Sequence, residues 1–408
     1  MRILFVAYGG GHIASLIPLI KALKPQKNIE IFTFALTTAQ NSLEKEGIDF
    51  FDYTNLPFFT SEYVLKRGKE LLSTLDTQKI NSEESIAYLG WNIIELEETY
   101  GVNEASKMYA EKGRNCFFPI RLMKKILQFY EIDFLISTNS PRSERAALEA
   151  ASHLDVPSLC IIDGFAKYES EWISQPGFSK KVCVFSESVK KNLIKLGRPE
   201  EDILVTGNPA FDAFYVKFPK KKIKQFREKL GLCVNQKLIL YASNPESDFH
   251  IFDGRIGDVA LPEKVLETLV EYIGEKEGYS LIYRPHPSQQ LQKFDKAILS
   301  ERIILDEGFD LLTLLHASDV VVTLASTVGV QAQIVGKPLI CMNSSVYADD
   351  MYYEDFGYVR RVNSLEELKE ALPLQERSNC KQQFRLAKHH TATRKVLQVL
   401  SLFQLNSA

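Results

Sequence analysis

The chain repeats one pattern: a short apolar run rich in β-branched residues, followed by a stretch with helical periodicity. The runs are continuous instead of alternating with polar positions, which is typical of strands buried on both faces of a parallel sheet. Repeats of strand, helix and strand predict a doubly wound α/β fold. In the first half we expect strands at Ile3–Tyr8, Ile29–Ala35, Phe134–Ser137, Ser158–Ile162, Val182–Phe185 and Ile203–Thr206, and helices at Ile13–Leu23, Ala39–Glu46, Pro119–Tyr130, Ser143–Leu154 and Glu187–Leu196.

The alternation restarts at Lys237 and predicts a second lobe of the same class. Two Rossmann-like lobes then face each other, with the carboxyl ends of both sheets around one interdomain cleft, where open α/β sheets bind ligands. The final helical stretch, Asn379–Phe403, has no strand after it and is expected to pack back on the first lobe. Strands are expected at Leu238–Ala242, Ser280–Arg284, Arg302–Leu305, Val320–Thr323 and Pro338–Met342, and helices at Pro262–Ile273, Leu311–His316 and Val328–Val335.

Two segments break the alternation. Residues 56–112 are polar, helical in period and carry aromatic residues, which predicts a helical insertion that either shapes an acceptor site or serves packing alone. Residues Phe211–Glu228 are rich in lysine and predict a linker, residues 213–236, that enters a helix and whose charges are solvated. The expected domains are therefore a first lobe over residues 1–212, the linker, a second lobe over 237–378 and a C-terminal helix over 379–408.

Composition narrows the class of protein. A chain of 408 residues exceeds what one core usually organises, and its formal net charge of −3 gives no reason to expect a nucleic-acid partner. The six cysteines are scattered, with no CxxC pair and no metal-ligand spacing, so we expect reduced thiols. The apolar start is interrupted by glycines after Tyr8, and no window reaches the length of a spanning helix. We therefore expect a cytoplasmic protein.

The first loop with chemistry follows the first predicted strand and reads Gly9-Gly10-Gly11-His12. Glycines let the backbone approach a ligand and expose the amides at a helix N-terminus. The spacing is not the GxGxxG fingerprint, so it gives little support for NAD binding. His12 at the start of the helix either caps it or acts as a general base towards a hydroxyl group.

Further candidates lie where other strands of the first lobe end. Asp163 and Glu144 either orient His12 or act as the base, and the alternative roles are a helix cap or an ion pair with Arg142 or Arg145. At the end of this lobe, the turn that contains Asn208 is a hinge without chemistry or part of the site.

The second lobe offers loops suited to a phosphate group. Ser243 and Asn244 follow its first strand, and Arg284 and His286 follow its second. His286 lies between two prolines, and Arg284 carries a fork of donors that suits phosphate. The Ser326-Thr327 pair stands at a strand-to-helix turn, where it is an N-cap or a phosphate site.

One apolar and basic stretch, Phe117–Lys125, allows two interpretations. It is a helix at a membrane surface, or a core-facing helix with a solvated edge, and we favour the second.

The order of these motifs resembles the GT-B superfamily over nearly the whole chain. That superfamily includes the lipid-linked N-acetylglucosaminyl transferase, the plant-type UDP-glycosyltransferases and the UDP-N-acetylglucosamine 2-epimerases. Gly11-His12-Ile13 looks like the first loop of the UDP-glycosyltransferases, and Thr206–Pro209 looks like a junction of the epimerases. Arg284–Pro287, together with Ser326-Thr327, resembles bacterial capsule and sialic-acid-type transferases. Gln331 departs from the glutamate that relatives often use to bind ribose.

The resemblance implies an inverting, metal-independent glycosyltransferase of capsule or other cell-envelope polysaccharide biosynthesis. The second lobe would bind a CMP- or UDP-sugar as substrate, with no cofactor, and the first would bind a glycan or lipid-linked acceptor at the inner face of the membrane. Alternatives are a nucleotide-sugar 2-epimerase or hydrolase, a CDP-alcohol glycerophosphotransferase, and a non-catalytic sugar-nucleotide binding protein. The implied catalytic residues are His12, Asp163 and Glu144, and the implied donor-binding residues are Gly10, Gly11, Asn208, Ser243, Asn244, Arg284, His286, Ser326, Thr327 and Gln331.

Overall fold

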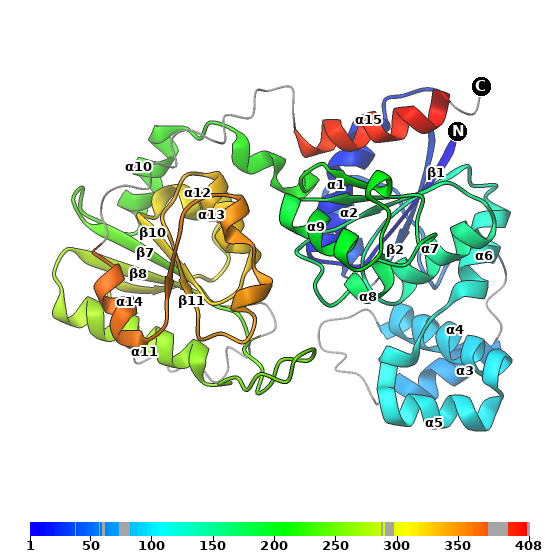
Figure 1. The fold of residues 1–408 in the computed structure, drawn as a ribbon, viewed down its shortest axis with the longest axis horizontal. Helices are drawn as coiled ribbons and strands as arrows, with labels where there is room; N and C mark the ends of the chain where they lie inside the picture. The colour runs from blue at the N-terminus through cyan, green and yellow to red at the C-terminus, as the bar shows by residue number, and fades with distance from the viewer. Residues whose placement is uncertain are drawn as a thin grey trace. The chain divides into compact units, whose positions relative to one another are not determined.

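The computed structural model describes residues 1–36, 38–56, 58, 62–72, 82–286, 289, 298–373 and 391–405. It forms two compact units (Figure 1). The N-terminal unit comprises Met1–Ala210 and the segment from His389 onward, and the C-terminal unit comprises Phe211–Lys388. Each unit holds one six-stranded parallel sheet with helices packed around it, so the predicted fold class is confirmed. Among the described helices, none is both long and apolar enough to cross a bilayer.

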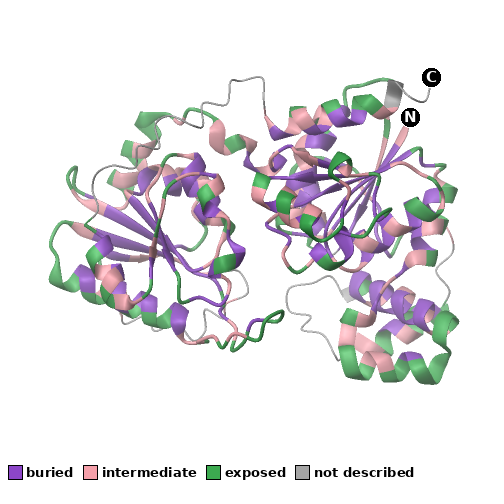
Figure 2. Cartoon of the chain, viewed as in Figure 1, coloured by how far each residue is buried: buried purple, intermediate pink, exposed green. Residues whose placement is uncertain are grey.

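The sheet of the N-terminal unit has the order β2-β1-β3-β4-β5-β6. Its inner strands are buried on both faces, which explains their continuous apolar sequences (Figure 2). The strands span Arg2–Ala7 (β1), Glu30–Ala35 (β2), Phe134–Thr138 (β3), Ser158–Ile161 (β4), Lys181–Val184 (β5) and Ile203–Val205 (β6).

Helices connect these strands, and one helix returns to them from the far end of the chain. Val396, Val399 and Leu400 of α15 belong to the same buried cluster as Ile13 and Leu16 of α1, so the C-terminal helix completes the core of the N-terminal unit. Its predicted packing on the first lobe is confirmed. The helices outside the 56–112 region are α1 (Gly11–Leu23), α2 (Ala39–Lys45), α6 (Ile120–Phe129), α7 (Ser143–His153), α8 (Ser170–Ile173), α9 (Glu187–Lys195) and α15 (Ala392–Leu405).

The region from residue 56 to residue 112 is helical in its described part, as predicted. It contains α3 (Glu62–Leu71), α4 (Ser82–Tyr100) and α5 (Val102–Lys112). The helices α3 and α4 touch through their backbones at Gly68 and Gly90, where a Cβ atom would overlap a carbonyl oxygen of the other helix.

The apolar side of α6 faces the protein interior. Leu122, Met123, Ile126 and Leu127 are buried, and α6 packs against α7. Glu95 accepts hydrogen bonds from the amides of Arg121 and Leu122 at the start of α6. The core-facing interpretation of this stretch is therefore confirmed.

The sheet of the C-terminal unit has the order β12-β11-β10-β7-β8-β9. Its core contains Ile239, Leu281 and Val322 from the central strands and Val265 and Leu269 from α11. The strands are β7 (Lys237–Ala242), β8 (Tyr279–Arg284), β9 (Ile303–Leu305), β10 (Val320–Thr323), β11 (Leu339–Met342) and β12 (Val359–Val362), and the helices are α10 (Lys220–Lys229), α11 (Leu261–Glu275), α12 (Leu311–Ala317), α13 (Thr327–Ile334) and α14 (Leu365–Ala371).

One part of this unit differs from the sequence-based expectation. The edge strand β12 and the following α14 were not predicted, because Arg360 and Arg361 interrupt the apolar run of a strand that is partly exposed. In the lysine-rich segment, where the sequence predicts a linker that enters a helix, the structure has the helix α10, none of whose residues is buried. Of the predicted final helix, residues 379–390 lie outside the described residues, and the described part begins at Ala392.

Candidate active site

In the N-terminal unit, three loops meet at the carboxyl edge of neighbouring strands. The strands β1, β3 and β4 are adjacent in the sheet, so the loops that follow them converge. They carry His12, Thr138 with Asn139, and Asp163. Sequence reasoning selected His12 and Asp163, and the structure brings these two side chains together.

The ring of His12 is held through one nitrogen. Its Nδ1 atom lies 3.0 Å from the hydroxyl oxygen of Thr138 and 3.5 Å from Oδ2 of Asp163. No partner for Nε2 is found among the described residues, and about a fifth of the side chain is exposed (20%). A proton on Nδ1 would face the Thr138 hydroxyl and the Asp163 carboxylate, and Nε2 would then be left as a base.

The glycine loop makes this geometry sterically feasible. A Cβ atom on Gly11 would lie 2.9 Å from Oδ2 of Asp163, so a larger residue at this position would displace the carboxylate from the start of α1. Gly10 has a φ of 68°, a conformation that favours glycine, and has open space above it. The close approach at Gly11 is thus to the protein's own Asp163, and donor binding by Gly10 and Gly11 stays a prediction.

Asn208 fixes the backbone of Asp163 from the junction at the end of β6. Its amide donates to the Asp163 carbonyl oxygen (2.9 Å), and its Oδ1 lies 3.0 Å from the Ser15 hydroxyl of α1. Asn139 accepts from the Asp163 amide (3.1 Å). The predicted turn residue Asn208 therefore belongs to the same cluster as His12.

Glu144 is buried beneath the glycine loop. Its Oε1 accepts a hydrogen bond of 2.6 Å from the backbone amide of Tyr8, at the start of that loop. Burial raises the pKa of the Glu144 carboxyl. The proposed ion pair with Arg145 is not formed, because Arg145 pairs with Glu149. The contacts support a role for Glu144 in bracing the loop, and its catalytic role stays a prediction.

Glu169 is a residue of this cluster that sequence reasoning missed. Burial, with a smaller contribution from the nearby charge of Asp163, raises its pKa from the usual 4.5 to about 7, against the lowering effect of His12. Glu169 lies just before the short helix α8 and far from any predicted strand end. A carboxylic acid that titrates near neutral pH beside a histidine is suited to proton transfer.

Replacement of Glu169 by glutamine should stabilise the protein more at pH 8 than at pH 5. A carboxyl group whose pKa is raised on folding makes its full contribution to the stability of the folded protein below about pH 4.5. This contribution is lost as the pH rises through about 7. The difference between Glu169→Gln and the wild type should therefore grow by about 1–3 kcal/mol between these pH values. Urea unfolding at both pH values measures it. Glu171→Gln, at an exposed neighbour, is the control, and an equal difference at both pH values would contradict the assignment.

In the C-terminal unit, the turn between β10 and α13 has its amides almost fully committed. The amide of Ala325 donates to Oδ1 of Asn244 (3.0 Å), and that of Val328 donates to the Ser326 hydroxyl (3.2 Å). The amide of Gly329 donates to the carbonyl of Ser326 (3.0 Å). Ser326 is thus an N-cap, while the exposed Thr327 offers its amide and hydroxyl at the start of α13.

A second cluster in this unit joins the loops after β7 and β8. Gln289 donates to the Ser243 hydroxyl (3.2 Å) and accepts from the backbone amide of His286 (2.7 Å). Desolvation lowers the pKa of His286, which favours its neutral form. Because β10, β7 and β8 are adjacent, Ser243, His286 and the Thr327 turn share one edge of the sheet. Pro287 and Ser288, the rest of the predicted loop, lie outside the described residues.

The Arg284 side chain makes structural contacts within the C-terminal unit. Its Nη1 lies 2.5 Å from Oδ2 of the buried Asp306 and 3.2 Å from the carbonyl oxygen of Phe309. The other oxygen of Asp306 accepts from the amide of Phe309 (2.7 Å). Arg284 therefore fixes the turn after β9, and phosphate binding by this residue stays a prediction, as does ribose binding by the half-buried Gln331.

Metal ligands do not cluster in the described part of the chain, where no group of three or more His, Cys, Asp or Glu side chains could hold an ion. The described cysteines are free thiols, and burial raises the pKa of Cys183 to about 12.

Comparison with known proteins places the fold. A family model described as "Protein of unknown function (DUF354)" matches residues 215–400, and no curated protein shows a significant sequence match. The UDP-GlcNAc 2-epimerase of Neisseria meningitidis, solved with UDP-GlcNAc, is similar at a TM-score of 0.61 and 15% identity, with 99% of this chain and 100% of that chain covered. Anabaena HepE, solved with UDP and glucose, has a TM-score of 0.56 at 15% identity, covering 98% and 99%.

A third solved structure, a glycosyltransferase from Rickettsia africae, has a TM-score of 0.56 at 15% identity, covering 98% of this chain and 97% of the other. These likenesses extend over both units, and the topology of two parallel six-stranded sheets agrees with them. The chain therefore has the GT-B fold.

Proposed function

We propose that the protein is an enzyme that binds a nucleotide sugar and transfers the sugar to a hydroxyl group with inversion at the anomeric carbon. The observation that supports it most is the His12 ring, whose Nδ1 faces Thr138 and Asp163 while Nε2 has no described partner. Asp163 would fix the tautomer and stabilise the imidazolium that forms, and Nε2 would take the proton from the acceptor hydroxyl.

The C-terminal unit would bind the nucleotide and its phosphates. The amide and hydroxyl of Thr327 lie at the N-terminus of α13, where the helix dipole favours negative charge. His286 stands at the same sheet edge. These donors would stabilise the charge that grows on the leaving diphosphate, with no metal ion required. The proposed acceptor is a glycan or a lipid-linked sugar at the inner face of the membrane.

The choice of nucleotide follows from solved structures of the same fold. The Neisseria epimerase was solved with UDP-GlcNAc, and HepE was solved with UDP and glucose. We therefore propose UDP as the nucleotide, in preference to CMP.

UDP should raise the melting temperature of the purified protein by roughly 5–10 °C when its concentration is a hundred times its dissociation constant. A ligand that binds only the folded state adds about 2.7 kcal/mol under this condition. Differential scanning fluorimetry with UDP, CMP and uridine measures the effect. A response to UDP that Thr327→Ala weakens supports the assigned phosphate site. No response to any nucleotide would exclude it.

A 2-epimerase is the second candidate, favoured by the pair of carboxyl groups near His12. Proton abstraction and return at carbon need a base and an acid, and Asp163 and Glu169 would supply them, since Glu169 has a pKa of about 7. Incubation with UDP-GlcNAc in D2O without an acceptor separates the two reactions. An epimerase or hydrolase incorporates deuterium at C2 or releases UDP, whereas a transferase leaves the donor intact until an acceptor is added.

A further inference from the structure

A tyrosine from a loop far along the chain holds the proposed phosphate turn. The hydroxyl of Tyr353 accepts from the amide of Ser326 (2.8 Å) and donates to the carbonyl oxygen of the same residue (2.7 Å). Tyr353 is fully buried, and burial raises the pKa of its hydroxyl well above the ordinary value, so it stays a donor. The Tyr353 side chain thus fixes both backbone polar groups of Ser326.

Gly329 of α13 has no side chain and so leaves room for the ring of Tyr353. A Cβ atom at this position would lie 2.6 Å from Cε1 of Tyr353. The ring therefore packs directly against the first turn of α13, beneath the residues that we propose to bind phosphate. The orientation of the Ser326 backbone consequently depends on Tyr353.

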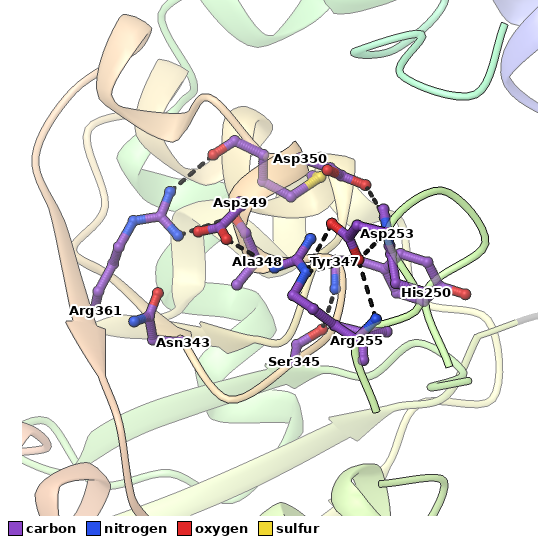
Figure 3. A network of polar contacts seen from close by, with 12 residues as sticks. His250, Asp253, Arg255, Asn343, Ser345, Tyr347, Ala348, Asp349, Asp350 and Arg361 are labelled. Carbon is purple, nitrogen blue, oxygen red and sulfur yellow. Dashed lines mark hydrogen bonds and ion pairs between the residues drawn. The ribbon is translucent and has the colours of Figure 1, made fainter. Parts of the chain in front are cut away.

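The loop that carries Tyr353 is itself held from two sides (Figure 3). On one side, Nε2 of the buried His250 lies 2.9 Å from Oδ2 of Asp350. On the other, Arg361 of β12 donates to the carbonyl oxygens of Ala348 (3.0 Å) and Met351 (2.8 Å). A braced loop loses little conformational freedom when a ligand binds, so Tyr353 is preorganised.

Most backbone amides of the turn at residues 325–329 already have a hydrogen-bond partner. Those of Ala325, Val328 and Gly329 are bound within the turn or by Asn244, and Tyr353 takes that of Ser326. Within residues 325–329, Thr327 is then the position whose amide has no described partner. An anion that approached this turn would therefore find the amide of Thr327 available.

We propose that Tyr353 is a positioning residue for the nucleotide diphosphate, acting through the Ser326 backbone to present the amide and hydroxyl of Thr327. The inference rests on the proposed function, because it assumes that the turn binds a diphosphate. Tyr353 does not touch the ligand itself.

The test compares Tyr353→Phe with Tyr358→Phe, which removes the same hydroxyl from an exposed tyrosine of the same segment. Isothermal titration of the full chain with UDP should show about tenfold weaker binding for Tyr353→Phe and no change for Tyr358→Phe. Uridine, which lacks the phosphates, should bind both variants and the wild type equally. Because Tyr353 acts through the turn, Tyr353→Phe and Thr327→Ala should be less than additive in a double-mutant cycle.

Hydrogen exchange of the peptide that covers residues 324–330 gives a second measurement, which needs no ligand. Its amides should exchange faster in Tyr353→Phe than in the wild type, with the rest of the C-terminal unit unchanged. Unaltered exchange would overturn the positioning role whether or not UDP binds. If the wild type binds UDP and Tyr353→Phe binds it equally well, the inference fails and the proposed function stands. If the wild type does not bind UDP, the proposed function fails.

Discussion

Replacing His12 by alanine should lower turnover by two to four orders of magnitude and leave nucleotide binding unchanged. General bases contribute a factor of about 10²–10⁴ to the rate, and His12 is the proposed base. The substitution also leaves the carboxylate of Asp163 without the ring that lies 3.5 Å away, but it removes no group of the C-terminal unit.

The measurement is the rate of UDP release from a UDP-sugar with a saccharide acceptor, alongside titration of UDP binding. His153→Ala replaces an exposed histidine at the end of α7 in the same unit and is the control, which should behave as the wild type. A His12→Ala protein with wild-type turnover would refute the base assignment. Loss of UDP binding would instead indicate that His12 belongs to the donor site.

Replacing Arg198 by methionine should destabilise the N-terminal unit by about 3–5 kcal/mol. This arginine is only 1% exposed, and its guanidinium group lies between three carbonyl oxygens. It donates to Gln175 (2.9 Å), Ser179 (2.5 Å) and Ile173 (3.4 Å), and it lies 3.3 Å from the Asp202 carboxylate. Methionine would remove the guanidinium donors from the buried carbonyl oxygens of Ile173 and Ser179, which costs the desolvation energy of each group.

The expected fall in melting temperature is roughly 10 °C, measured by calorimetry of both proteins. Arg121→Met is the matched control, because Arg121 forms a surface ion pair with Glu98 that should contribute less than 1 kcal/mol. Equal melting temperatures for Arg198→Met and the wild type would contradict the structural role. Since Arg198 binds the carbonyl of Ile173 at the end of α8, the variant should also lose activity if Glu169, at the start of that helix, takes part in catalysis.

The architecture could be predicted because strands buried on both faces have an unmistakable sequence. The run from Ile3 to Ala7 and the run from Val320 to Thr323 are continuous and apolar, and both are central strands. Loops after such strands follow directly, which is why His12, Asp163 and Thr327 could be selected. The strand β12 could not be predicted. It is a partly exposed edge strand, and its two arginines interrupt the apolar run that identifies the other strands.

The missed residues share one property: their roles arise from tertiary contacts between distant segments. Tyr353 acts on Ser326 across 27 positions, and Gln289 reaches Ser243 across 46. Glu169 follows no strand, and its raised pKa comes from burial that local sequence does not encode. Arg284 shows the converse. Its position at the end of a strand suggests phosphate binding, but its side chain contacts the buried Asp306, 22 residues away, which the local sequence does not reveal.

The return of α15 to the first sheet has a consequence for the order of folding during synthesis. Val396, Val399 and Leu400 belong to a core whose other members lie before residue 205, so that core stays incomplete until α15 has left the ribosome. All segments of the C-terminal unit emerge earlier and in one piece. Although domains usually fold in the order of their synthesis, the later unit is here expected to reach its native state first, and the earlier one to wait on the ribosome with part of its apolar surface exposed.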